Sequence, residues 1–184
     1  METKLFMLLL GCKPQGRYTE QHDVFFGAGA ALKDLLPGIH AFWPGPHKIH
    51  IDAWREVTEV DGFRISLVPK KEQGEKKWQL FFINLGGYKQ HEFEEYHYKM
   101  LVVAEDKAGA IKQAKASAFY KHTGFKGADS HIDDKYGVDV DDLYEIEEIL
   151  DAGIKEKYSI RIEEHFSGAK DEWVLGYTKL SSLV

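Results

Sequence analysis

The stretch "LFMLLLGCKPQGRYTEQH", Leu5–His22, decides the fold, because the chain carries a second version of it, "LFFINLGGYKQHEFEEYH", at Leu80–His97. Seven of the eighteen positions are identical, several times the number expected by chance. The identical pairs are Leu5/Leu80, Phe6/Phe81, Leu10/Leu85, Gly11/Gly86, Gln15/Gln90, Glu20/Glu95 and His22/His97. Further on, "HID" at 50–52 reappears at 131–133. The sequence therefore predicts a tandem duplication.

The repeat also decides between two interpretations of the first apolar run. Lys4–Cys12, "KLFMLLLGC", resembles a lipoprotein signal that would anchor Cys12, and it also fits a buried β-strand that ends at a glycine. The second copy of the run lies in mid-chain, where no signal peptidase would act, and Glu2 interrupts the basic start. We therefore predict a strand in both copies and no membrane anchor.

Working outward, each copy is predicted to consist of strand, strand, helix and strand. In the first copy we expect strands at 5–10, 23–27 and 48–54, and a helix at 28–36 that ends before Pro37. In the second copy we expect strands at 80–85, at 98–104 and around His131, and a helix capped by Asp106. The segment 138–150, "VDVDDLYEIEEIL", fits a strand or a helix, and we favour helix or irregular structure.

A hairpin is expected to complete each copy. Alternating apolar residues at 63–68 and 78–82 flank the turn "PKKEQGEKK", and a similar pair lies at 158–162 and 173–177. The predicted fold class is α+β: a tandem duplication of a strand-strand-helix-strand unit plus hairpin, with halves related by a pseudo-twofold axis. The first repeat would span 1–77 and the second 78–184, together in one compact body.

Composition narrows the class of protein. The 184 residues are 43% hydrophobic and 29% charged, which suits one ordinary domain or two small ones. A net charge of −6 argues against a nucleic-acid partner, since phosphate binding needs Lys and Arg. No apolar run reaches the length of about 20 residues that a membrane helix needs. Cys12, the only cysteine, fits a reducing compartment. We expect a soluble cytoplasmic protein; a small-molecule ligand and a homo-oligomer stay open.

The repeated polar sets are the candidate ligand or metal residues. They are Glu20, His22, His50 and Asp52, and the copies Glu95, His97, His131 and Asp133. Two-residue spacing places both polar groups of a pair on one face of a strand. Two imidazoles and two carboxylates suit Zn, Mn or Fe, or an acid/base pair. A purely structural role, in which each histidine fixes a loop or satisfies buried groups, explains the same pattern.

Two functional hypotheses follow, and they predict different geometry. The first is a non-catalytic ligand-binding or interaction module, with dispersed histidines and an apolar groove between the copies. The alternative is a metal-dependent enzyme, in which the ring nitrogens of His22 and His50 converge in a cleft beside a carboxylate. The sequence holds no HExxH helix, phosphate loop, Rossmann fingerprint or nucleophile elbow, so no catalytic residue is assigned. A divalent metal is the one cofactor that the residues suggest.

Four stretches carry a resemblance to a known family: "EQHDVFFG", "LKDLLPGIHAFWP", "KIHIDAWREV" and "HIDDKYGVDVDD". With these, the chain resembles a small bacterial family, domain of unknown function 1543, whose domain occurs in one or two copies per chain. The resemblance implies a two-copy bacterial protein with no assigned activity. It transfers no catalytic residues.

Overall fold

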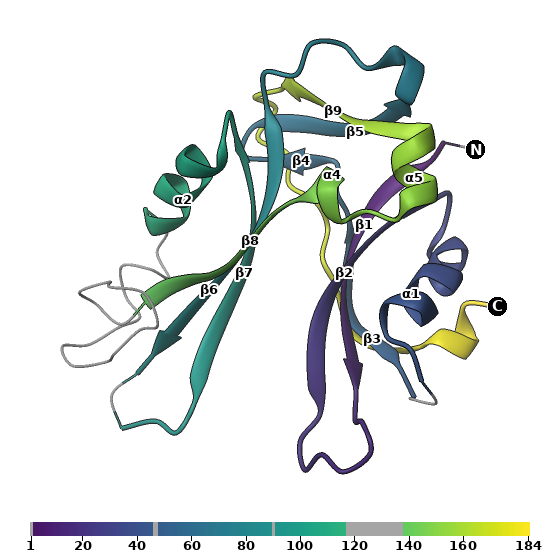
Figure 1. Ribbon diagram of the computed structural model, residues 1–184, viewed down its shortest axis with the longest axis vertical. Helices are drawn as coiled ribbons and strands as arrows, with labels where there is room; N and C mark the ends of the chain where they lie inside the picture. Colours follow the sequence, from purple (N-terminus) through teal and green to yellow (C-terminus); the bar gives the residue numbers. More distant parts are fainter. Residues whose placement is uncertain (1, 46–47, 90, 117–137) are drawn as a thin grey trace. The chain divides into compact units, whose positions relative to one another are not determined.

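The chain divides into two compact units, each with its own antiparallel sheet structure. The computed structural model describes residues 2–45, 48–89, 91–116 and 138–184. Unit 1 comprises Met1–Gln73 and Leu150–Val184, and unit 2 comprises Gly74–Ile149. The described strands form three antiparallel sheets, two in unit 1 and one in unit 2 (Figure 1). A mixed α+β fold is therefore confirmed.

The four-stranded sheet of unit 1 is built around β1 (Lys4–Cys12). β1 lies between β2 (Gln21–Gly29) and β3 (His50–Glu56), and β10 (Val174–Lys179) pairs with the outer side of β3. The side chains of β1 are buried along most of its length, so the continuous apolar run reflects a strand covered on both faces. The strand interpretation of Lys4–Cys12 is confirmed.

The helical segment of unit 1 differs from the prediction. Residues 28–29 end β2, a 3₁₀ turn η1 (Leu32–Leu35) follows, and helix α1 (Leu36–Phe42) comes after it. The prediction that the helix ends before Pro37 is wrong, because Pro37 lies in the first turn of α1. A proline is well tolerated there, since the first N–H groups of a helix have no partner within the helix. α1 buries Ile39 against the β1 core.

The sheet of unit 2 is built around β6 (Gln79–Tyr88), which lies between β7 (Glu95–Ala104) and β8 (Val138–Glu145). Helix α2 (Lys107–Lys115) packs on this sheet through Ala110 and Ala114, whose small side chains allow close approach. The predicted cap is confirmed: Asp106 Oδ1 accepts a hydrogen bond from Gly109 N at 2.7 Å.

The segment 138–150 is mainly a strand, so the preference for helix or irregular structure is wrong. β8 pairs with β6, and a short helix α4 (Ile146–Ile149) follows it. Val140 and Leu143 pack against the core of unit 2, which favours the extended form although local spacing also fits a helix.

The two predicted hairpins do not form. β5 (Phe63–Pro69) pairs with β4 (Glu59–Val60) and with β9 (Tyr158–Glu164), not with β6, and β10 pairs with β3 instead of β9. Along β5 and β9, Ile65 faces Ile162 and Leu67 faces Ile160, so both apolar stripes share one face. The remaining elements are η2 (Lys70–Glu72), α5 (Ala152–Lys157) and η3 (Leu180–Ser182).

The described residues of the stretches Leu5–His22 and Leu80–His97 form matching strands within their own sheets. Each forms the central strand and then begins the antiparallel neighbour. The register of the other neighbour also shifts at matching places, between Leu9 and Leu10 in one sheet and between Asn84 and Leu85 in the other. Each shift leaves one extra residue, Asp52 on β3 and Asp141 on β8.

Candidate metal centres

A glycine on each central strand makes room for the candidate site residues. Gly11 on β1 lies opposite His22 on β2 and opposite His50 on β3. Residues directly opposite in a sheet point to the same face, so both imidazoles rise beside a position that has no side chain. A Cβ on Gly11 would lie 2.5 Å from Asp52 Oδ2 and 2.6 Å from His50 Nε2. The first cluster therefore occupies the space above Gly11.

The first-sheet cluster consists of Glu20, His22, His50 and Asp52. Glu20 precedes β2, two residues before His22, and Asp52 is the extra residue at the bulge of β3. Two-residue spacing places Asp52 on the same face as His50, and the bulge leaves Asp52 without a residue directly opposite it on β1. All four residues named as candidates in unit 1 are thus brought together.

The four members form a closed ring in which histidines and carboxylates alternate. His22 Nε2 lies 3.3 Å from Asp52 Oδ2 and 3.8 Å from Glu20 Oε2. His50 Nε2 lies 3.1 Å from Glu20 Oε1 and 3.3 Å from Asp52 Oδ1. Each of the two ring nitrogens lies beside both carboxylates, as the metal hypothesis requires, although these ligand atoms are not all within 4.8 Å of one another.

One side of this ring is buried and the other is open to solvent. The His50 side chain is 7% exposed, and its ring lies 4.4 Å, centroid to centroid, from that of Tyr177. Asp52 Oδ2 is buried and accepts no hydrogen bond from any described residue. His22 and Glu20, in contrast, have side chains that are 42% and 43% exposed. An ion could therefore approach from the His22 side.

Cys12 directly follows Gly11 in sequence but is unsuited to be a ligand. Its side chain belongs to the apolar core of unit 1 and is fully buried. Burial, with a smaller effect of the negative charge on Glu20, raises the pKa of the Cys12 thiol. Metals and electrophiles react with the thiolate, so this environment disfavours both.

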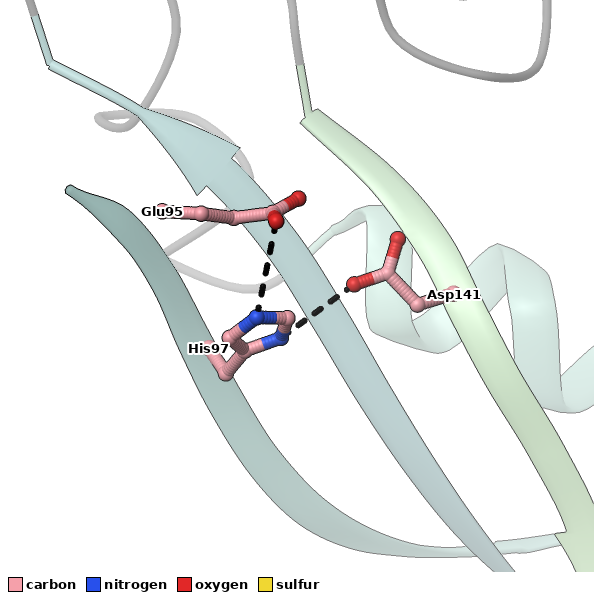
Figure 2. A group of neighbouring side chains, drawn as sticks. All are labelled: Glu95, His97 and Asp141. Atoms are coloured by element: carbon pink, nitrogen blue, oxygen red, sulfur yellow. Dashed lines mark ion pairs between the residues drawn. The ribbon is translucent and has the colours of Figure 1, made fainter. Parts of the chain in front are cut away.

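The second-sheet cluster consists of Glu95 and His97 on β7 and Asp141 on β8 (Figure 2). His97 Nε2 lies 3.8 Å from Glu95 Oε2, and His97 Nδ1 lies 3.3 Å from Asp141 Oδ2. Among the described residues, this is the set whose candidate ligand atoms all lie within 4.8 Å of one another, so the first-sheet ring is the more open of the two. Gly86 lies opposite His97, and a Cβ there would collide with the Asp141 carboxylate.

The sequence predicted two members of the second-sheet cluster and missed the third. Glu95 and His97 come together as expected, while His131 and Asp133 lie outside the described residues. Asp141 was missed because the sequence match "HID" directed attention to 131–133. In the strand register, Asp139 and Asp141 occupy the positions in the second sheet that correspond to His50 and Asp52 in the first. Only the bulge in β8 could have indicated this correspondence.

A cavity of about 320 Å³ in unit 1 lies apart from the clusters. Its lining includes two carboxylates, Asp34 and Asp151. Asp34 Oδ2 accepts hydrogen bonds from two backbone N–H groups, and Asp151 Oδ1 accepts one from Gly153 N at 2.8 Å. Because both carboxylates serve the backbone, the cavity offers less to a ligand than the clusters do.

A comparison with known protein families matches the segment that contains the first-sheet cluster. Residues 17–67 match the family model of a domain of unknown function, DUF1543. This segment contains Glu20, His22, His50 and Asp52. The match is a single copy of that domain.

A solved structure resembles nearly the whole chain in its fold. The crystal structure of a protein Il1583 from Idiomarina loihiensis is 23% identical, with a TM-score of 0.64, and the match covers 97% of this chain and 98% of that one. No curated protein matches the sequence. Of the helices that the structure describes, none is both long and apolar enough to cross a membrane.

Proposed function

We propose that the protein is a metal-binding module whose first-sheet cluster binds a divalent transition-metal ion. The observation that carries the proposal is the alternating ring of two imidazoles and two carboxylates above Gly11. Donors bonded to one tetrahedral zinc ion at about 2.0–2.2 Å lie roughly 3.3–3.6 Å from one another. Neighbouring members of the ring are 3.1–3.8 Å apart. The two histidines contact different oxygens of each carboxylate, and the ligand atoms are not all within 4.8 Å of one another, so the exposed Glu20 and His22 side chains would have to move inward to bind one ion.

The donor set indicates the class of metal. Imidazole nitrogens favour Zn, Cu, Fe and Ni, whereas sets made only of oxygen favour Mg and Ca. His50 and Asp52 form a prearranged, mostly buried half, and the buried Asp52 Oδ2, which accepts no hydrogen bond from the described residues, is a polar atom whose burial a bound cation would compensate. Within the ion-pair ring, the contact of this oxygen is His22 Nε2 at 3.3 Å, on an exposed side chain.

Zinc titration of the intact chain tests the proposal. After removal of metal with a chelator, isothermal titration calorimetry should detect one zinc site that depends on His22 and His50. Zinc at one hundred times its Kd would stabilise the fold by about 2.7 kcal/mol, which raises Tm by roughly 5–11 °C for a chain of this size.

Matched variants separate binding at the cluster from adventitious binding. His22→Ala should weaken zinc binding by at least about tenfold, while His40→Ala, which removes an exposed histidine of α1 outside the cluster, should leave it unchanged. Equal binding by both variants, with both folded by circular dichroism, would reject the proposed site.

Catalysis by the bound metal is the second candidate function. It is favoured by the exposure of His22 and Glu20, because catalytic zinc sites keep one position open to water whereas structural sites are closed. A metal-dependent hydrolase would lose turnover in His22→Ala and regain none with added zinc. Zinc-loaded protein that hydrolyses no faster than its His22→Ala variant, across activated ester and phosphate substrates, would leave only the binding role.

We also propose that the chain arose by tandem duplication of a strand-strand-helix-strand unit. The identical positions of Leu5–His22 and Leu80–His97, together with the same strand pairing and the same bulge position, support it.

The lone buried cysteine fits a reducing compartment such as the bacterial cytoplasm.

A further inference from the structure

We infer that unit 2 carries a second metal site with a different preference: Glu95, His97 and Asp141 bind a harder, oxygen-seeking divalent ion such as Mn²⁺. This site is built within one sheet of unit 2, so it does not depend on the first-sheet cluster. The two sites would make the protein a binder of two dissimilar ions.

The three candidate ligand groups of unit 2 lie close together. The candidate ligand atoms of Glu95, His97 and Asp141 all lie within 4.8 Å of one another, and Figure 2 shows the His97 ring between the two carboxylates. Their side chains are 38%, 38% and 28% exposed. An ion held by these three groups would keep room for water, which Mn²⁺ and Mg²⁺ use to complete their coordination.

The absence of a side chain at Gly86 leaves space for the Asp141 carboxylate. Gly86 Cα lies between His97 on β7 and Asp139 on β8 in the strand register, and a Cβ on it would meet both oxygens of the Asp141 carboxylate. The bulge between Asn84 and Leu85 places Asp141 above this glycine. An ordinary side chain at position 86 would therefore occupy the volume into which the carboxylate projects.

The Asn84 side chain contacts the His97 ring. Asn84 is 9% exposed, and its Nδ2 lies 3.2 Å from His97 Nδ1 and 3.2 Å from Asp142 Oδ2. Asn84 Oδ1 is buried without a hydrogen-bond partner among the described residues. In metal sites a ligating imidazole donates its other N–H to such an outer group, so Asn84 would support a metal-bound His97 with its amide turned so that the buried Oδ1 accepts from Nδ1–H. Asn84 is therefore a positioning residue for the site.

The two clusters differ in their donor types, since the first-sheet cluster has two imidazoles and the second-sheet cluster has one. The register position that carries His50 in the first sheet carries Asp139 in the second. One imidazole with carboxylates is a harder set than two imidazoles with carboxylates, so Mn²⁺ competes better here than at the first-sheet cluster, although Zn²⁺ remains the tighter-binding ion at either set. The remaining imidazole favours Mn²⁺ over Mg²⁺ and Ca²⁺, which prefer oxygen ligands alone.

Electron paramagnetic resonance with Mn²⁺ tests the inference on the intact chain, because bound Mn²⁺ loses the sharp six-line signal of the free ion. The His22→Ala/His50→Ala double variant, which lacks the first-sheet imidazoles, should still bind one Mn²⁺ per chain in the presence of excess Mg²⁺. Glu95→Gln, which keeps the shape of the side chain, should weaken that binding by at least about tenfold. Glu94→Gln, a change in the adjacent exposed carboxylate, should leave it unchanged.

Each other outcome overturns the inference. Loss of Mn²⁺ binding in the folded His22→Ala/His50→Ala variant would place the ion in the first sheet. Equal weakening by Glu94→Gln and Glu95→Gln would indicate only a general attraction to acidic groups. An unchanged six-line signal with folded wild-type protein would mean that His97 is simply held in ion pairs with Glu95 and Asp141.

Discussion

Replacing Gly11 with alanine tests whether the space above this residue belongs to a binding site. Gly11 has no left-handed backbone, so the substitution adds a methyl group without backbone strain. The new Cβ would lie 2.5 Å from Asp52 Oδ2 and 2.6 Å from His50 Nε2, where ordinary contacts begin at 3.4 Å. Both donors must therefore retreat by about 0.8–0.9 Å.

Such a movement should harm binding far more than folding. Metal–ligand distances tolerate only about ±0.2 Å, so a displacement of this size removes two donors from bonding range and should weaken zinc binding by about 10–100-fold. The clashing atoms are the ends of side chains, which can swing aside. The cost of overpacking, about 1–3 kcal/mol, is also partly offset by about 0.4–1 kcal/mol from a less flexible unfolded chain. We expect a net loss of stability of about 1 kcal/mol.

Calorimetric titration with zinc, combined with urea unfolding, measures both effects. Gly74→Ala is the matched control, since a Cβ at Gly74 meets no atom within 4 Å, and it should bind zinc as the wild type does. A Gly11→Ala protein that binds zinc as tightly as Gly74→Ala would refute the assignment of this space to a metal.

Three further predictions concern stability and reactivity. Asp171 accepts hydrogen bonds from Thr58 and pairs with the buried Arg55 guanidinium at 3.5 Å, so Asp171→Ala should lower the free energy of unfolding by about 3–5 kcal/mol in urea titrations; a loss below 1 kcal/mol would show that the pair is dispensable. Partial burial raises the pKa of Glu145 above its usual 4.5, so the folded state holds this proton more tightly than the unfolded state, and stability should fall as pH rises from about 4.5 through the folded pKa. Glu145→Gln should flatten that fall in unfolding measured from pH 4 to 7, and an unaltered pH profile would contradict the assignment. Because Cys12 is buried with a raised pKa, a thiol reagent should label it only at the rate of unfolding, whereas labelling within seconds in native buffer would mean that the site is open.

Features that depend on neighbouring residues could be predicted from the sequence. The apolar run of Lys4–Cys12 predicted a buried central strand, and Asp106 predicted the start of α2, because burial and capping leave local patterns. The convergence of Glu20, His22, His50 and Asp52 followed from two-residue spacing on strands that were expected to be neighbours.

Features that depend on which strands pair could not be predicted in this way. The alternation along Phe63–Pro69 identified a strand and its apolar face, but not that Tyr158–Glu164, far along the chain, supplies its partner. Pro37 was interpreted as the end of a helix, although proline is also favourable in the first turn of a helix, where it lies in α1. Asp141 reaches the second-sheet cluster through a bulge, a shift of register that leaves no signal in composition or periodicity.

Anomalous X-ray scattering at the zinc absorption edge, from crystals of the zinc-loaded chain, tests the central claim most directly. The account predicts a peak above Gly11, about 2.0–2.1 Å from a ring nitrogen of both His22 and His50, with Asp52 or Glu20 as a further ligand. Ordered imidazoles at His22 and His50 with no anomalous peak between them would contradict it.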